Sequence, residues 1–196
     1  ANDKLLMIIE DYGASHLGAV TPEGGMALDL FISTSLQLVE GLSAIHDQGI
    51  IHKGINPSNI LVNPTTLVSK FSDFSLSSQL KLEALQAVSP HQLEGALSYI
   101  SPEQTGRMNR SVDYRSDYYS LGATFYYMLT GQPPFLSDDP MEMVHHHIAR
   151  RLPNLAEVRA DVPVELAQIV GKLQEKNAED RYQSCFGVKS DLLKVK

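Results

Sequence analysis

The spacing of hydrophobic residues along the chain predicts that most of it is helical. Between Ser33 and Gln48, apolar side chains recur at helical intervals, which places them on one face of a helix. Gly49 follows this segment and is typical of a helix end. Similar apolar stripes predict later helices over residues 118–129, 166–173 and 185–195.

Two helix boundaries are marked by residues with special conformational preferences. Gly131, followed by Pro133 and Pro134, ends the helix predicted at 118–129. Asp139 and Pro140 are typical of a helix start, because an acidic side chain caps the first turn and proline fits the first helical position. We therefore expect a further helix directly after Asp139.

A small β element is predicted within this mostly helical chain. Short apolar runs of strand type occur on either side of a loop of turn-forming residues, at 50–52, 60–62 and 67–71. Another apolar run, at 5–9, predicts a buried strand that leads into a turn. No internal repeat or interdomain linker is visible. We therefore expect one domain over residues 1–196, mainly α with a small β element.

Composition limits the classes of protein to which the chain can belong. The hydrophobic share of 43% and the charged share of 20% are ordinary for a globular domain. The net charge is −7, whereas proteins that bind nucleic acid are usually basic, so we expect no nucleic-acid partner. We identify no signal peptide and no apolar stretch near the roughly 20 residues that cross a bilayer. We therefore expect no membrane insertion.

Cysteine and histidine give no metal-binding pattern. Cys185 is the single cysteine, which excludes an internal disulfide, fits a cytoplasmic location and predicts a buried core residue. His145, His146 and His147 are consecutive, so on a helix they point about 100° apart and do not converge on one ion. We expect these histidines on a solvent-facing helix.

The loop from His52 to Asn59 is ambiguous when considered alone. Pro57 and the asparagines suit any turn, and a histidine beside apolar residues is more often structural than catalytic. The order of several segments along the chain is more specific. These segments are 52–54 with Asn59, 72–75, 101–103, 113–122, 129–135 and finally Arg181.

This ordered set resembles the C-terminal lobe of a eukaryotic-type Ser/Thr protein kinase over essentially the whole chain. Segments 56–63 and 103–110 are most similar to the kinase modules of large bacterial multi-sensor signalling proteins, which join a kinase domain to ATPase and sensor domains and often to a histidine kinase. The resemblance implies a kinase C-lobe whose N-lobe is absent apart from its last strand and hinge. It divides the chain into that strand and hinge (1–13), the catalytic loop and metal-binding Asp (50–76), the activation segment (77–103) and a helical subdomain (104–196).

The resemblance also implies roles at a nucleotide site. Ile9 would lie at the gate of an adenine pocket, and the backbone of Glu10 and Tyr12 would bond the adenine edge. Asn59 and Asp73 would bind Mg²⁺, for which their oxygen atoms are suitable ligands. ATP and Mg²⁺ are thus the implied cofactors, although the family's Gly-rich loop and phosphate-binding lysine would lie upstream of Leu5, outside this sequence.

Three further residues are expected to be structural, as in the family that the chain resembles. Glu103 would form a buried ion pair with Arg181 and so support the activation segment. Asp117 would cap the central helix and hold the backbone of the catalytic loop. His52, by contrast, is grouped with positions 54 and 56 as a candidate residue of the catalytic site.

The chain departs from the kinase pattern where the reaction would occur. The catalytic Asp of the family is replaced by Gly54, which has no side chain to accept a proton from the substrate hydroxyl. The catalytic-loop Lys is replaced by Asn56, and the Thr that ties these two residues together is replaced by Ala96. The change at Ser75, in place of the Gly of Asp-Phe-Gly, is milder.

These departures favour a catalytically degenerate, regulatory kinase-like domain in signal transduction. An active Ser/Thr kinase domain, seen truncated, is the alternative, and a helical interaction module without nucleotide binding is a second. The chain begins without methionine, which suggests a fragment of a longer protein. Its expected partners are the N-lobe and other domains of that polypeptide. Without the N-lobe, uncovered apolar surface would promote self-association.

Overall fold

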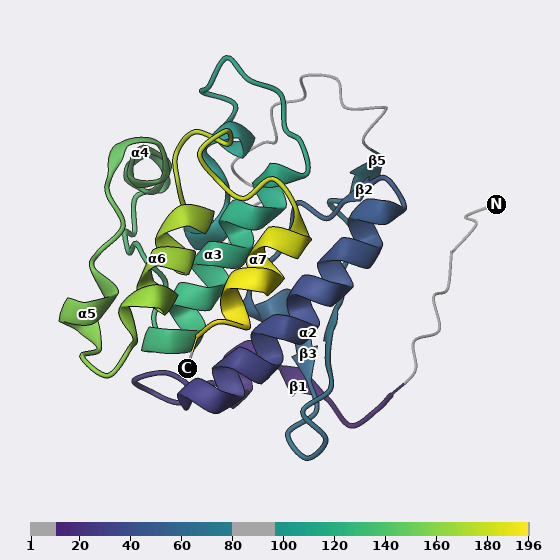
Figure 1. Ribbon diagram of the computed structural model, residues 1–196. Helices are drawn as coiled ribbons and strands as arrows, with labels where there is room; N and C mark the ends of the chain where they lie inside the picture. The colour runs from purple at the N-terminus through teal and green to yellow at the C-terminus, as the bar shows by residue number, and fades with distance from the viewer. Residues whose placement is uncertain (1–10, 80–96, 196) are drawn as a thin grey trace.

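A bundle of helices forms the body of the molecule (Figure 1). The computed structural model describes residues 11–79 and 97–195. Two long helices, α2 (Leu28–Asp47) and α3 (Arg115–Thr130), pack against each other and against two shorter ones, α6 (Val164–Leu173) and α7 (Cys185–Leu192). Helix α4 (Pro140–Ala149) and the short α5 (Leu155–Val158) complete this part of the chain.

Helix α3 lies at the centre of the hydrophobic core. Almost all of its residues are buried, on every face, because α2 and α6 cover it from different directions. Phe125 of α3 meets Phe31 of α2 edge to face, with ring centroids 5.4 Å apart. Gly131 ends the helix in the left-handed conformation (φ 77°), as its position in the sequence predicts.

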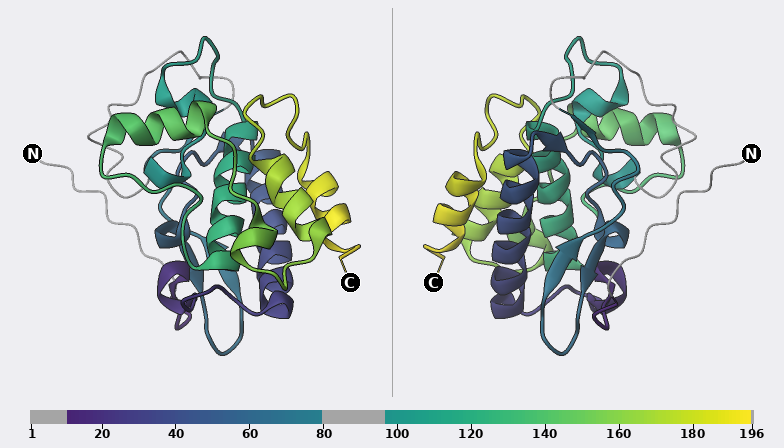
Figure 2. Two further views of the ribbon diagram at one scale, coloured as in Figure 1. Left: turned by 90° about the vertical axis from the view of Figure 1, so that its left-hand side faces the viewer. Right: turned by 90° about the vertical axis from the view of Figure 1, so that its right-hand side faces the viewer.

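The strands are short and lie beside the bundle. Strands β1 (Ser15–His16), β3 (Ile60–Val62) and β4 (Ser69–Phe71) form an antiparallel sheet in the order β1-β3-β4, and β4 packs against α2 (Figure 2). Strand β2 (Ile50–Ile51) pairs instead with β5 (Ser78–Gln79). The prediction of a mainly helical domain with a small β element is confirmed.

Short helical turns connect these elements. In the described residues they include α1 (Leu17–Val20) and the 3₁₀ turns η1 (Pro57–Asn59), η4 (Leu97–Tyr99) and η5 (Pro102–Thr105). The turn before α2 packs directly on the end of α3, where Met26 N donates to Met128 O. Gly25 adopts φ 91° there, and a Cβ on it would lie 2.1 Å from Leu129 O, so only glycine fits.

The predicted helices are present, with shifted boundaries. Helix α2 begins at Leu28, five residues before the predicted start at Ser33, and α4 begins after Asp139, whose carboxylate accepts Met141 N as a cap. The predicted strand at 5–9, with Ile9 and Glu10, lies outside the described residues, as do Ala96 and most of the activation segment.

Two predictions about surface and membrane character need correction. Helix α2 has the length and mean hydropathy (1.3) of a membrane span, whereas the sequence was expected to contain no such apolar stretch; 33% of its most apolar 18-residue window is buried, and the helix packs against α7 and β4. His146 and His147 are buried rather than solvent-facing, and only His145 is exposed. His147 is held inside because its Nδ1 hydrogen-bonds the Tyr119 hydroxyl at 3.0 Å.

Candidate functional site

A buried carboxylate on α3 accepts hydrogen bonds from the backbone of the loop between β2 and η1. Asp117 is fully buried and accepts hydrogen bonds from the backbone N–H groups of His52 (2.9 Å) and Lys53 (2.8 Å). The structure therefore gives Asp117 the loop-holding contact that the resemblance implied. It does not cap α3, since Asp113 accepts Arg115 N at the start of that helix instead.

A charged histidine completes the environment of Asp117. His46, near the end of α2, lies with its Nε2 2.9 Å from Asp117 Oδ2. Burial disfavours the protonated imidazole, but the hydrogen bond and charge of Asp117, together with a contribution from Cys185, outweigh that cost and raise the pKa of His46 to about 9. His46 and Asp117 thus form an ion pair near neutral pH, a contact that sequence reasoning missed because 71 residues separate the two.

His52 joins the loop to the segment after β4. Its Nδ1 accepts Gly54 N at 3.3 Å, so its Nε2 carries the hydrogen and donates to Ser72 O at 3.2 Å. Burial lowers the pKa of His52, which is consistent with this neutral form. Both ring nitrogens therefore position backbone, and the ring packs on Phe74 with centroids 4.7 Å apart.

Gly54 occupies a position that does not require glycine. Its φ is not in the left-handed region, and a Cβ built on it would lie 3.5 Å from Asn59 Nδ2 and 3.6 Å from both His52 Nδ1 and Leu76 Cδ1. These are ordinary van der Waals separations. The backbone would therefore accept a side chain at the position where the kinase pattern has its catalytic Asp.

Asn56 has a structural task in the same loop. Its Oδ1 accepts the backbone N–H groups of Ser58 (2.8 Å) and Asn59 (3.2 Å), and so caps η1, while its Nδ2 donates to Gly54 O (3.0 Å). Both polar atoms of the side chain at the family's Lys position are thus hydrogen-bonded to the backbone of the loop.

Asn59 and Asp73 are the two residues whose side-chain oxygen atoms the resemblance assigns to Mg²⁺. Asn59 donates its Nδ2 to Gly54 O at 2.9 Å, so its remaining side-chain atom is a carbonyl oxygen. Asp73 is exposed at φ 54°, and hydrogen bonds from Ser75 hold the pKa of its carboxyl below the usual range. The backbone bond from Ser72 N to Asn59 O ties the two segments together.

This donor set fits Mg²⁺ bound jointly with phosphate. Mg²⁺ is commonly held by one or two protein oxygen ligands plus waters and substrate phosphate, not by an all-protein cage. Within residues 11–79 and 97–195, no group of three or more His, Cys, Asp or Glu side chains is arranged to hold a metal. Asn59 and Asp73 would supply the protein ligands, and waters and nucleotide phosphate would supply the others.

The end of the activation segment is anchored by a buried, bidentate ion pair. Arg181 Nη1 lies 2.6 Å from Glu103 Oε1, and Nη2 lies 2.9 Å from Oε2. Ser116 donates its hydroxyl to Glu103, and Arg181 also donates to the backbone oxygen atoms of Arg115, Glu175 and Lys176. The structure thus places together the two residues that the resemblance paired.

Gln104 is a residue of this region that sequence reasoning missed. Its Nε2 donates to Lys53 O at 2.8 Å, and its Oε1 accepts Ser101 N at 3.0 Å. It therefore connects η5 directly to the catalytic-loop backbone. Its position three residues after Ser101, as in a capping box, was the available signal.

Tyr12 is the one predicted hinge residue within the described part. Its hydroxyl donates to Leu61 O at 3.0 Å, its carbonyl accepts Asn63 Nδ2, and Lys70 Nζ lies 4.6 Å from its ring centroid. The segment at Tyr12 is thus attached to β3 and β4. Ile9 and Glu10 lie outside the described residues.

Comparison with known proteins matches the chain to one family. The model of the protein kinase domain matches residues 1–192. The chain is 32% identical to serine/threonine-protein kinase PknB of Mycolicibacterium smegmatis over 196 residues, and 33% identical to that of Mycobacterium tuberculosis over 191. These matches cover 99% and 96% of the chain but only 31% and 30% of the relatives.

A second kind of relative carries a histidine kinase name. Hybrid signal transduction histidine kinase G of Dictyostelium discoideum is 30% identical over 232 residues, which cover 84% of this chain and 7% of that protein. The chain therefore spans less than a third of the length of each of these relatives.

Proposed function

Because the chain belongs to the protein kinase domain family, we propose that it is a member deficient in phosphoryl transfer, acting as a regulatory or scaffolding module of a larger signalling protein. The observation that carries this proposal is Gly54. The backbone there accepts a side chain without strain, so the missing carboxylate is not a requirement of the fold. It is a loss of the group that would take the substrate proton.

The size of that loss supports inactivity. A positioned general acid–base group contributes about 10²–10⁴ in rate, which corresponds to roughly 3–5 kcal/mol of activation free energy. In the family, the Lys side chain places a positive charge next to the phosphoryl group that is transferred. With Asn56 in its place that charge is missing, and electrostatic stabilisation of the transition state is usually the largest contribution to catalysis. Because Asn56 caps η1, its side chain does not take over that role.

A residual Mg²⁺–nucleotide site is part of the same proposal. The oxygen atoms of Asn59 and Asp73 fit a phosphate-bridged Mg²⁺, which favours nucleotide binding over a purely helical interaction module. An upstream N-lobe would supply the upper half of such a site. We therefore expect the chain alone to bind Mg²⁺–ATP weakly or not at all, and to need its upstream partner to avoid self-association.

An active kinase is the alternative function, and one observation favours it. The PknB relatives carry the name of serine/threonine-protein kinases, at 32–33% identity. For this chain to act as they are named, a carboxylate from elsewhere would have to reach the space above Gly54. The partners, cytoplasmic location and lack of nucleic-acid binding expected from the sequence remain part of the proposal.

The experiment is a phosphate-transfer assay on the chain joined to its upstream sequence. The readout is incorporation of labelled γ-phosphate into the protein itself and into a general kinase substrate, with a PknB kinase domain as the positive control. We expect incorporation at background. Incorporation above background that is lost on Asp73→Asn would overturn the proposal, because Asp73 would then serve a working Mg²⁺ site.

A further inference from the structure

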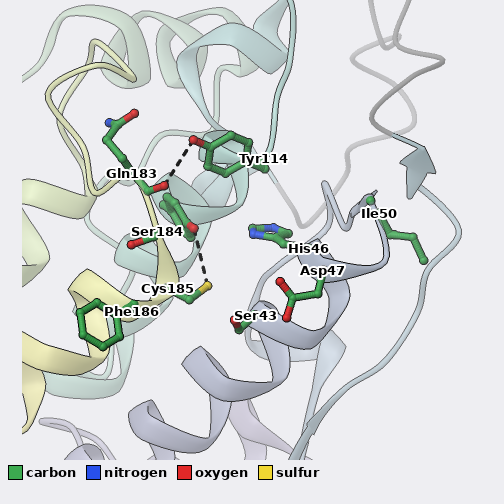
Figure 3. Close-up of a pocket in the computed structure, with 11 residues that line it drawn as sticks. Ser43, His46, Asp47, Ile50, Tyr114, Gln183, Ser184, Cys185 and Phe186 are labelled. Carbon is green, nitrogen blue, oxygen red and sulfur yellow. Dashed lines mark hydrogen bonds between the residues drawn. The ribbon is translucent and has the colours of Figure 1, made fainter.

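A pocket of about 300 Å³ lies between the end of α2, the start of α3 and the start of α7 (Figure 3). Its walls include His46, Tyr114, Tyr118, Cys185 and Phe186. The volume is at the lower end of the range for small-molecule pockets. None of the residues that the kinase resemblance assigns to nucleotide or Mg²⁺ lines it.

The pocket wall contains a buried polar atom without a partner. The side chain of His46 is 11% exposed, and its Nε2 is bonded to Asp117, whereas its Nδ1 has no hydrogen-bond partner among the residues that the structure describes. Because Nε2 donates to Asp117, Nδ1 is the ring nitrogen that remains for a ligand, and the raised pKa of His46 favours a hydrogen on it. A buried donor left unpaired is costly, so this atom favours a ligand that brings a hydrogen-bond acceptor.

The other residues that line the pocket favour an aromatic, uncharged ligand. The rings of Tyr114 and Tyr118 lie edge-on to His46, with centroids 5.8 and 5.5 Å away. Phe186 is 80% exposed although it is a large apolar residue, so an aromatic ligand would cover its ring. The charge of His46 is already balanced by Asp117, and Asp47 also lines the pocket, which disfavours an anion.

We propose that this pocket binds a small, neutral aromatic compound that carries a carbonyl or amide oxygen. The oxygen accepts the hydrogen of His46 Nδ1, and the ring packs among Tyr114, Tyr118 and Phe186. The site adds to the proposed function without resting on it, since its residues take no part in phosphoryl transfer.

Occupancy of the pocket is transmitted to the catalytic loop by one chain of hydrogen bonds. His46 Nε2 bonds Asp117 Oδ2, and Asp117 accepts the backbone N–H groups of His52 and Lys53. A ligand that fixes the His46 ring therefore also fixes these two amides. The pocket is thereby a regulatory site for the loop, whether or not the loop catalyses a reaction.

Cys185 provides a built-in reporter for the test. It is the only cysteine, it lines the pocket, and its Sγ lies 3.6 Å from the Tyr118 hydroxyl oxygen. Acetanilide, a neutral aromatic amide, is the probe, and the rate at which iodoacetamide alkylates Cys185 is read by intact-protein mass spectrometry. At about ten times its dissociation constant, acetanilide leaves about a tenth of the sites empty, so alkylation slows about tenfold.

Alanine variants of two exposed apolar residues distinguish binding in the pocket from binding elsewhere on the surface. Phe186→Ala removes a pocket wall and is expected to need about tenfold more acetanilide for the same protection. Leu193→Ala, at a residue 62% exposed outside the pocket, is expected to match the parent. Acetanilide is also expected to slow hydrogen exchange at the amides of His52 and Lys53.

Three results would overturn the proposal. Alkylation that is unchanged by acetanilide would exclude binding, and equal protection of the parent and Phe186→Ala would place the probe elsewhere. Protection without slower exchange at His52 and Lys53 would exclude the link to the catalytic loop. These results do not depend on whether the protein transfers phosphate, so the pocket and the proposed function are tested separately.

Discussion

Replacement of Glu103 by alanine removes one half of a buried ion pair at the end of the activation segment. The Glu103 and Arg181 side chains are 2% and 0% exposed and are joined by two short hydrogen bonds. Loss of one partner in such a pair leaves an unpaired buried charge and costs about 3–5 kcal/mol. For a domain of this size, that corresponds to a fall in melting temperature of roughly 6–20 °C.

The assay is thermal and urea unfolding followed by circular dichroism, with an exposed ion pair as the control. Glu40 and Lys189 also lie within hydrogen-bond distance, at 2.7 Å, but their side chains are 58% and 41% exposed. Glu40→Ala is therefore expected to change stability by only about 0–1 kcal/mol. Equal effects of Glu103→Ala and Glu40→Ala would refute the argument from burial.

The pH dependence gives a second check on the same pair. Burial alone would raise the pKa of Glu103, but the hydrogen bonds and charge of Arg181 lower it below the ordinary value. The stabilisation is therefore present above the unfolded-state pKa of about 4.3 and is lost as the pH falls through the folded-state pKa. The difference between the parent and Glu103→Ala should shrink below that pH; a difference that grows on acidification would contradict the assignment.

Two further predictions follow from the backbone and from His46. Gly25→Ala should destabilise the domain strongly in urea unfolding, whereas Gly24→Ala, also at positive φ but with open space at its Cβ, should cost only about 1–2 kcal/mol; equal costs would exclude the contact with α3. Because its pKa rises from 6.5 to about 9, His46 should stabilise the fold fully below pH 6.5 and lose that contribution as the pH rises through 9. The stability difference between the parent and His46→Gln should therefore shrink over that interval, and a difference that is constant with pH would refute the ion pair with Asp117.

Local sequence signals predicted the helices where those signals were present. Gly131 and Asp139 each mark a boundary that the structure shows. The start of α2 was placed too late because Ala27 offers no capping side chain, so nothing in the sequence marks it. Helix α5 was missed because its four residues are too few to show a periodic pattern.

Contacts between distant segments limited what the sequence predicted of the site. The burial of His147 depends on Tyr119, and the charge of His46 depends on Asp117; neither pair is close in sequence. The capping role of Asn56 was within reach, because Asn-Pro is a typical helix start. The kinase pattern, by contrast, indicates only a missing Lys at this position and carries no information about a cap.

Transfer of labelled γ-phosphate by a series of restored variants tests the central claim most directly. The series consists of the parent, Gly54→Asp, and Gly54→Asp combined with Asn56→Lys and Ala96→Thr, each joined to the upstream sequence. We predict background transfer by the parent, incomplete recovery in the single variant because the Lys and Thr positions are still altered, and a gain of about 10²–10⁴ in rate when all three are restored. Robust transfer by the parent, unchanged by Gly54→Asp, would show that the reaction does not depend on a carboxylate at this position.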